Sequence, residues 1–369
     1  MNAATTTIRI ATERTTILAL DLGKYKSVAC VYDPATSSGR FTTIETTHEE
    51  LRRLILQEQP SVLVIEACAQ AAWVHDLSVR LGVPCKIANT AAEAWKFKHV
   101  KRKTDKDDAL RLAELEAMDK LPSVTLPAQR TRQWRMLMRT RQALLRDRVA
   151  VQNRIRSYLV GQGLPAPRGF RAWTADGLKG IGQYARPLAE CAAEELWRGM
   201  LASALDHLGY LWTQLEQIEA QLDAIGEKNE SVQLLQTIPG VGRRTAETVV
   251  AYLDDPPRFK TGKQVSAYSG MVPKQYQSGE QDRRGRITRR GPRLLRTMLV
   301  ECAWCLLRYN TWGRAVYQRL THGGKSRKRQ AIVALGRKLL VRCWAMLRDR
   351  KPWRDDPPIA LAQTPASVA

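Results

Sequence analysis

Short apolar runs separated by turn-forming residues recur through the first quarter of this 369-residue chain. Residues 17–21 and 26–33 are rich in β-branched and apolar side chains, and Gly23 lies between them, which predicts two strands joined as a hairpin. Residues 41–46 predict a third strand. The residues before position 17 are rich in threonine and lack a period, so we expect residues 1–16 to be disordered.

Helical and strand-like patterns then alternate. Residues 62–65 are apolar at every position, as in a strand that is covered on both faces of its sheet. The other segments are helices at 48–59, 69–81 and 103–118 and a strand at 84–88. Three strands, a helix, and then alternating strand and helix is the element order of a ribonuclease H-like α/β domain. We place this domain at residues 17–125.

Two long helices are predicted in the middle of the chain, residues 126–230. The first covers 129–159 and is rich in arginine. In the second, leucine repeats every seven residues, at Leu201, Leu208, Leu215 and Leu222. This spacing predicts either a coiled coil that joins subunits or a helical hairpin within one chain. Residues 161–184 contain several glycines and two prolines and predict a loop-rich insertion.

The net charge of the chain is concentrated after the first domain. The formal net charge is +23, of which residues 1–125 carry +1 and residues 126–369 carry +22. Such a basic surface predicts a polyanionic partner, usually nucleic acid. We expect a basic, mainly helical C-terminal domain at residues 231–352 and a flexible tail at 353–369.

Other protein classes are disfavoured by what the chain lacks. It has no run of ~18 apolar residues, so no membrane segment is predicted. Its seven cysteines show no framework spacing, and the Cys-x-x-Cys pair at Cys302 and Cys305 has no second pair, so neither disulfides nor a zinc site is predicted. We expect a cytoplasmic protein.

Four carboxylates of the first domain are candidates for metal binding. Asp21 and Glu66 each end an apolar strand, where a carboxylate is costly unless it binds a cation or hydrogen-bond donors. Asp105 and Asp108 are three residues apart, so both project from one face of the predicted helix. The four can surround two hard cations, as in phosphoryl transfer on nucleic acid. Alternatively, the helical pair complements the positive end of a helix that Thr104 caps.

The segments around these carboxylates resemble a known family. They read Leu-Asp-Leu-Gly-Lys at Asp21, Ile-Glu-Ala at Glu66, and Lys-Thr-Asp-Lys-Asp-Asp-Ala at Asp105 and Asp108. They are similar to the DEDD motifs of the one-ten family of insertion-sequence transposases, which includes Piv-type DNA invertases. The resemblance implies a first domain like that of the RuvC junction resolvase, with the DEDD positions at these four residues and not at Asp107.

A glycine turn marks the start of the C-terminal domain. Residues 237–242 read Thr-Ile-Pro-Gly-Val-Gly and precede a predicted helix that begins at Arg243. Glycine lets the backbone approach a phosphate, and the free N–H groups of a helix start favour an anion. We therefore expect phosphate contacts at Gly240, Gly242 and Arg243, as in a helix-hairpin-helix element. A turn with a purely structural role is the alternative.

Ser278 lies in a predicted flexible loop directly before a strongly basic segment. Residues 283–296 contain seven arginines and no acid. Arginines in such a segment can bind phosphates and stabilise a transition state while a serine attacks a phosphodiester. The expected nucleic-acid contacts here are Arg283, Arg284, Arg286, Arg289, Arg290 and Arg293.

The same segment carries the second resemblance to the one-ten family. Its Val-Pro-x-Gln-x-x-Ser-Gly sequence, followed by Gly-x-Ile and basic residues, is similar to the family's second motif block. The resemblance implies that Ser278 is the nucleophile, although Ser269 stands where the family has an apolar residue and is a second candidate. It further implies Mg²⁺ at the DEDD residues, a phosphoserine intermediate, a structured noncoding guide RNA, and homodimers that assemble into homotetramers with composite active sites.

Two other functions fit the residues. One is a metal-dependent junction nuclease in which water attacks the phosphate and Ser278 has no chemical role. The other is a nucleic-acid scaffold without enzymatic activity, in which the carboxylates cap helices. Substitution of the carboxylates and of Ser278 separates the three hypotheses.

Overall fold

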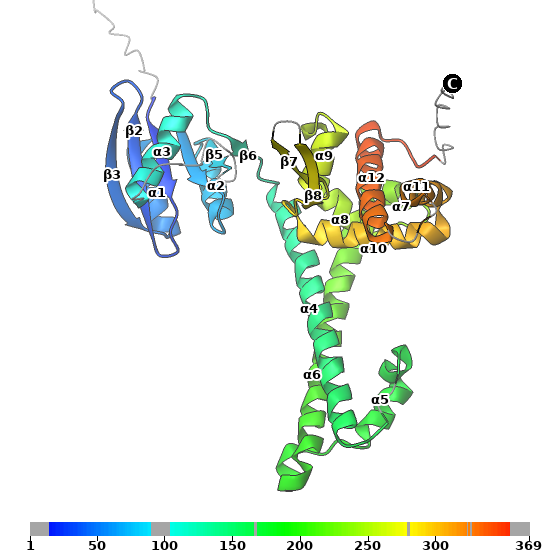
Figure 1. Ribbon diagram of the computed structural model, residues 1–369. Coiled ribbons are helices and arrows are strands. Elements are labelled where there is room, and N and C mark those ends of the chain that lie inside the picture. The colour runs from blue at the N-terminus through cyan, green and yellow to red at the C-terminus, as the bar shows by residue number, and fades with distance from the viewer. Residues whose placement is uncertain are drawn as a thin grey trace, which may run out of the picture. The chain divides into compact units, whose positions relative to one another are not determined.

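The computed structural model describes residues 15–89, 104–165, 168–278, 281–322, 324 and 327–354. Within a strand, the side chains of Ser278, Gln281, Asp282 and Arg284 lie outside this description. The chain divides into two compact units between Pro127 and Ala128, and each is considered by itself (Figure 1).

The N-terminal unit is built on a mixed six-stranded sheet. Its strand order is β3-β2-β1-β4-β5-β6. The strands are β1 (Ile17–Asp21), β2 (Lys26–Asp33), β3 (Ser38–Glu45), β4 (Val62–Glu66), β5 (Cys85–Ala88) and β6 (Ser123–Val124). Strands β1, β4 and β5 are parallel, while β2, β3 and β6 pair antiparallel with their neighbours. The predicted order of three strands, a helix and alternating strand and helix is confirmed.

Helices cover both faces of this sheet. On one face, α1 (His48–Glu58) and α2 (Ala71–Arg80) enclose a core that includes Leu20 and Ile65. On the other face, α3 (Asp105–Ala117) packs on a core that includes Ala19 and Val64 (Figure 1). Alternate residues of β1 and β4 therefore enter two different cores, which explains why both strands are apolar throughout.

The second unit contains two long helices that lie side by side, α4 (Gln129–Gly161) and α6 (Leu196–Glu227) (Figure 1). The heptad leucines of α6 are buried, and Leu201 and Leu208 share a core with Ile155 and Leu159 of α4. The repeat is thus used within one chain. The connection between α4 and α6 was expected to be a loop, but it also contains α5 (Ala175–Gly182), whose Ile181 enters the same core.

The rest of the second unit is mainly helical. Its helices are α7 (Glu230–Gln236), α8 (Arg243–Leu253), α9 (Gly262–Ser269), α10 (Arg293–Tyr309), α11 (Thr311–Thr321) and α12 (Lys328–Asp349). Single 3₁₀ turns lie at Phe170–Trp173, Leu188–Glu190, Ala193–Glu195 and Pro256–Arg258. The core formed by helices α7 to α12 also includes Trp134 from the start of α4 and Leu222 from the end of α6.

A two-stranded antiparallel sheet stands where a flexible loop was predicted. It consists of β7 (Pro273–Ser278) and β8 (Gln281–Ile287). Tyr276 is 60% exposed, and its ring lies over Gly285, where a Cβ would come within 2.9 Å of it. The sequence lacks the apolar alternation of a half-buried strand here, because the hairpin has no strongly buried face.

Arg244 of α8 forms ion pairs with Glu247 on its own helix and with Asp223 on α6. Both carboxylate oxygens of Glu247 accept hydrogen bonds from Arg244 at 2.9 Å, and Arg244 also donates to Asp223 at 2.9 Å. Glu247 is fully buried, and that burial raises its pKa. A Cβ at Gly226 would lie 2.4 Å from Glu247 Oε1, so the absence of a side chain on α6 makes room for the carboxylate.

None of the helices in the described ranges is both long enough and apolar enough to cross a membrane.

Candidate active site

Asp21 and Glu66 end neighbouring parallel strands at the same edge of the sheet. Leu20 is in register with Ile65, so the carboxylates that follow them lie next to each other across the pair. Side chains alternate along a strand, and Asp21 therefore shares the face of Ala19, and Glu66 that of Val64. That is the face covered by α3. The strand register thus places the two candidate strand carboxylates side by side.

Asp108 is on the buried side of α3. It is 8% exposed, and Ala109 and Leu112 beside it belong to the core beneath the helix. Leu110 is also packed against this core and lies against Gly39 of β3. Asp108 is thus buried between α3 and the face of the sheet to which Asp21 and Glu66 belong.

Asp105 and Asp107 occupy the first turn of α3 but have different surroundings. Asp107 forms a capping box: its Oδ2 accepts hydrogen bonds from the Thr104 N–H at 3.1 Å and the Thr104 hydroxyl at 2.7 Å, and its own N–H donates to Thr104 Oγ1 at 3.3 Å. Asp105 is exposed. The capping role thus belongs to Asp107, which leaves Asp105 and Asp108 unneeded for the box.

The chemical type of these side chains suits a hard divalent cation, because carboxylate oxygens are its usual protein ligands. Among the residues described, however, no three Asp, Glu, His or Cys side chains come close enough to form a metal cluster. The structure therefore supplies a pair of adjacent strand carboxylates, with Asp108 on the buried side of the helix that covers their face of the sheet, rather than a closed coordination shell.

Ser278 ends β7, and its backbone pairs with Gln281 across the hairpin. The position of its hydroxyl lies outside the described side chains. Ser269 is fully buried instead: its hydroxyl donates to the Ser266 carbonyl at 2.7 Å and accepts from the Met271 N–H at 3.3 Å. A substrate cannot reach Ser269 in this conformation, which argues against Ser269 as the nucleophile.

The arginines that follow Ser278 lie on β8 and on the segment after it. Those with described side chains are exposed, namely Arg283, Arg286, Arg289, Arg290 and Arg293, whereas the side chain of Arg284 is not described. Arg296 anchors this segment by donating to the Gly291 carbonyl at 2.8 Å and the Ser269 carbonyl at 3.2 Å. Burial, and then the nearby charges of Arg289 and Arg293, lower the pKa of Arg296. The exposed arginines thus form a concentrated positive surface on a tethered segment.

The glycine turn before α8 is packed more tightly than the sequence suggested. Gly240 has a φ of +92°, and a Cβ there would touch Leu306 and Cys305 of α10. Gly242 is the N-cap of α8, and no side-chain cap accompanies it. Arg243 donates to Asp223 at 2.8 Å and to Glu227 at 3.3 Å on α6. A phosphate at this helix start would have to compete with those carboxylates for Arg243.

Comparison with known proteins finds transposase family models that match both the N-terminal and the C-terminal parts of the chain. A family model described as "Transposase IS116/IS110/IS902 family" matches residues 232–318, and a DEDD-type model described as "Transposase" matches residues 18–162. The transposase for insertion sequence element IS1111A of Coxiella burnetii is 30% identical over 312 residues, which cover 79% of each chain. This chain belongs to the IS110 family of transposases.

Other relatives show the same relationship. The transposase for insertion sequence element IS1328 of Yersinia enterocolitica is 26% identical over 90% of this chain and 96% of its own. The pilin gene-inverting protein of Moraxella bovis is 32% identical over 38% of this chain and 44% of its own. Among solved structures, T. thermophilus RuvC in complex with a Holliday junction substrate covers 30% of this chain and 100% of its own, with 12% identity and a TM-score of 0.23. The fold description therefore rests on the topology of this chain.

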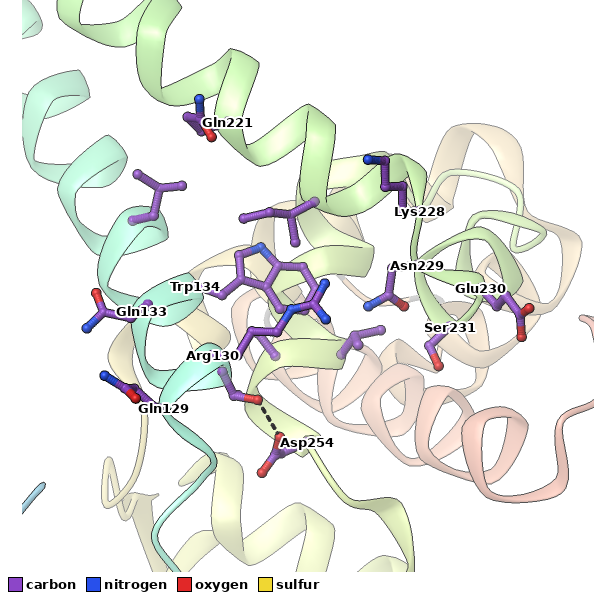
Figure 2. A pocket seen from close by; sticks show the side chains of 15 residues that line it. Gln129, Arg130, Gln133, Trp134, Gln221, Lys228, Asn229, Glu230, Ser231 and Asp254 are labelled. Atoms are coloured by element: carbon purple, nitrogen blue, oxygen red, sulfur yellow. Dashed lines mark hydrogen bonds between the residues drawn. The ribbon is translucent and has the colours of Figure 1, made fainter. Parts of the chain in front are cut away.

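The IS110-family transposase also contains a cavity that the sequence did not indicate. It has a volume of about 1090 Å³ and lies between the start of α4, the end of α6, α7 and the end of α8 (Figure 2). Trp134 forms part of its wall, and Thr131 donates to Asp254 at 2.8 Å beside it. None of the predicted site residues lines this cavity. Its lining comes from the start of α4 and from residues 221–254, which are far apart in sequence, so no local motif could reveal it.

Proposed function

We propose that this IS110-family transposase cuts and rejoins DNA through a phosphoserine intermediate at Ser278. Two observations support the proposal. Asp21 and Glu66 are adjacent on one sheet edge, on the face covered by the helix that carries Asp108, and Ser278 ends a strand whose partner carries exposed arginines. The adjacency of the two strand carboxylates is the observation that carries it, because carboxylate oxygens are the ligands that a hard divalent cation prefers.

In this proposal Asp21, Glu66, Asp105 and Asp108 hold Mg²⁺. The metal would neutralise charge on the phosphate and on the departing oxygen. The acidic residues contribute oxygen ligands from two strands and one helix, and the sheet register holds the strand pair at a fixed spacing. The exposed arginines Arg283 and Arg286 bind phosphates next to the scissile one.

The covalent step transfers the scissile phosphate from the 3′-oxygen of the DNA to Ser278. The Ser278 hydroxyl oxygen forms a bond to phosphorus, and the bond between phosphorus and the 3′-oxygen of the DNA breaks. The hydroxyl proton leaves Ser278 and a proton is taken up by the released 3′-oxygen, so the products are a 5′-phosphoserine and a 3′-hydroxyl end. Attack of a 3′-hydroxyl from another strand on the phosphoserine reverses the step and completes strand exchange.

Recognition of DNA is proposed to involve a structured noncoding RNA, and assembly to involve homodimers that form a homotetramer. The family resemblance and the net charge of +22 on residues 126–369 support these statements. A composite site, with the carboxylates of one chain and Ser278 of another, is part of the same proposal.

Trapping a protein–DNA adduct tests the serine step. The full chain is incubated with cognate element DNA, guide RNA and Mg²⁺, and the adduct is mapped by mass spectrometry after digestion. We expect DNA-derived mass on the peptide that contains Ser278, and none for Ser278→Ala. Ser269→Ala is the matched control and should still form the adduct. An adduct on another residue, or cleavage without any adduct, contradicts the proposal.

A metal-dependent nuclease without serine chemistry is the second candidate. The observation in its favour is that the sheet edge carries its carboxylates independently of the hairpin. It predicts that Ser278→Ala still cleaves DNA in Mg²⁺ while Asp21→Asn does not. The products distinguish the two mechanisms, because attack by water leaves a free 5′-phosphate or 3′-phosphate and no protein on either end.

A further inference from the structure

A groove of about 540 Å³ lies between α9, α11 and α12 and shares no residue with the sites above. Five of the residues that line it are cationic: Lys263, Arg319, Arg337, Lys338 and Arg342. Among the described residues of its lining, none is acidic. The groove is therefore a local concentration of positive charge contributed by three separate helices.

Close packing of the helices brings these cations together. Gly262 begins α9, and a Cβ there would lie 2.9 Å from Val341 of α12, so a glycine allows the two helices to approach. Lys263 comes from α9, and Arg319 comes from α11. Val316, which also lines the groove, is 2% exposed and belongs to the core of the unit, so the helices that carry these cations are held in place by buried contacts.

The charges in the groove repel one another. Burial, followed by the charges of Arg319 and Arg337, lowers the pKa of Lys338. In the part of the chain that the structure describes, no carboxylate is seen in an ion pair with Lys338, Arg319 or Arg337. Arg243 and Arg244 differ in this respect, because they are bonded to the carboxylates of α6 and α8. The groove thus holds cations that an external anion would stabilise.

The one aromatic ring in the lining argues against a base-specific ligand. Trp312 is 7% exposed, and the guanidinium of Arg342 lies 4.9 Å from the centre of its ring. A nucleobase cannot stack on a ring that is covered in this way. What remains accessible is a set of ammonium and guanidinium groups, which bind phosphate oxygens without regard to sequence.

We propose that this groove binds the phosphodiester backbone of a nucleic-acid strand, separately from the carboxylate edge and from Ser278. The site would hold DNA or RNA in place while contributing nothing to cleavage. The chemistry of a phosphodiester is common to both nucleic acids, so the experiment distinguishes them.

The affinity of the Lys338→Glu variant for nucleic acid tests the site. It is measured in a Ser278→Ala background without Mg²⁺, by fluorescence anisotropy with a random-sequence DNA duplex and an RNA duplex of the same sequence. At about 0.1 M salt we expect roughly tenfold weaker binding and a salt slope smaller by about one to two. The duplex whose binding weakens identifies the ligand. Lys179→Glu, on the exposed surface of α5, has the same change in charge and should stay within about twofold of the parent.

A neutral variant separates binding from folding. Lys338→Gln removes a repelled charge, so its Tm should equal or exceed that of the parent while binding weakens about threefold or more. If Lys338→Glu weakens neither duplex more than Lys179→Glu does, the inference is wrong. It is also wrong if Lys338→Gln lowers Tm and affinity together. Neither assay depends on an adduct at Ser278, so failure here leaves the proposed serine chemistry unaffected.

Discussion

The two units hold their candidate groups by different means. In the N-terminal unit, Asp21 and Glu66 are fixed by the register of two central strands, each with cores on both faces. In the second unit, Ser278 ends β7 of a two-stranded hairpin, and the described arginines of its partner β8 are exposed. The first arrangement positions acids in a sheet that has a core on each face. The second places Ser278 and exposed cations on a small element whose geometry a bound strand can adjust.

The carboxylate edge should give the largest effect. Asp21→Asn and Glu66→Gln each replace a carboxylate of the proposed Mg²⁺ site with an amide, so we expect loss of DNA cleavage by about 10³-fold or more, equivalent to about 4 kcal/mol at the transition state. Asp107→Asn is the control from the same acidic turn and should cleave normally, because its carboxylate serves the capping box. Single-turnover cleavage in Mg²⁺ measures all three. Full cleavage by both edge variants would contradict the role of these carboxylates in the serine mechanism and in the metal-dependent nuclease alike.

Removing charge from the hairpin should have a smaller effect. Arg283→Ala combined with Arg286→Ala deletes two exposed guanidinium groups of β8. We expect DNA affinity to fall about 10-fold to 100-fold and the salt slope to decrease by about two. Arg243→Ala should change DNA affinity much less, because its guanidinium is already bonded to Asp223 and Glu227. Equal losses for both variants would show that the glycine turn also contacts nucleic acid.

A third prediction concerns stability rather than activity. Gly226→Ala places a methyl group where the Glu247 carboxylate lies, so we expect the free energy of unfolding of the second unit to fall by about 1–3 kcal/mol. Gly209→Ala, on the same helix with open space around its Cβ position, should be neutral or slightly stabilising. Chemical denaturation followed by circular dichroism compares them, and equal stabilities would contradict the close contact.

The smallest expected effect is on pH dependence. Burial raises the pKa of Glu247, so the folded state binds this proton more tightly than the unfolded state does. The contribution of Glu247 to stability therefore falls as pH rises from the ordinary glutamate pKa through the raised one. Glu247→Gln removes the titration, and its unfolding free energy should decline less between about pH 4 and 7 than that of the parent. Parallel pH profiles would show that Glu247 does not titrate differently on folding.

The sequence predicted the N-terminal unit well because its signals are local. Residues 62–65 are apolar at each position, and the two cores on either side of β4 explain that run. Asp21 and Glu66 were each placed at the end of an apolar strand, and the parallel pairing of β1 with β4 brings them to the same edge. Thr104 caps α3, as the alternative interpretation of the helical pair assumed, but the aspartate of the capping box is Asp107.

The second unit was less predictable because its contacts join distant segments. Arg243 has its partners on α6, Asp223 and Glu227, and the turn motif contains no sign of them. Ser269 could be assessed only from its burial and hydrogen bonds. The hairpin β7–β8 escaped prediction because its side chains are polar and exposed, so no alternating pattern marked it.

The close contact at Gly226 has a consequence for variants of this gene that differ at the Gly226 codon. Every single-base change that replaces this glycine with another amino acid adds at least one atom where the Glu247 carboxylate lies. A copy of the gene in which this codon has changed is therefore expected to encode a less stable transposase.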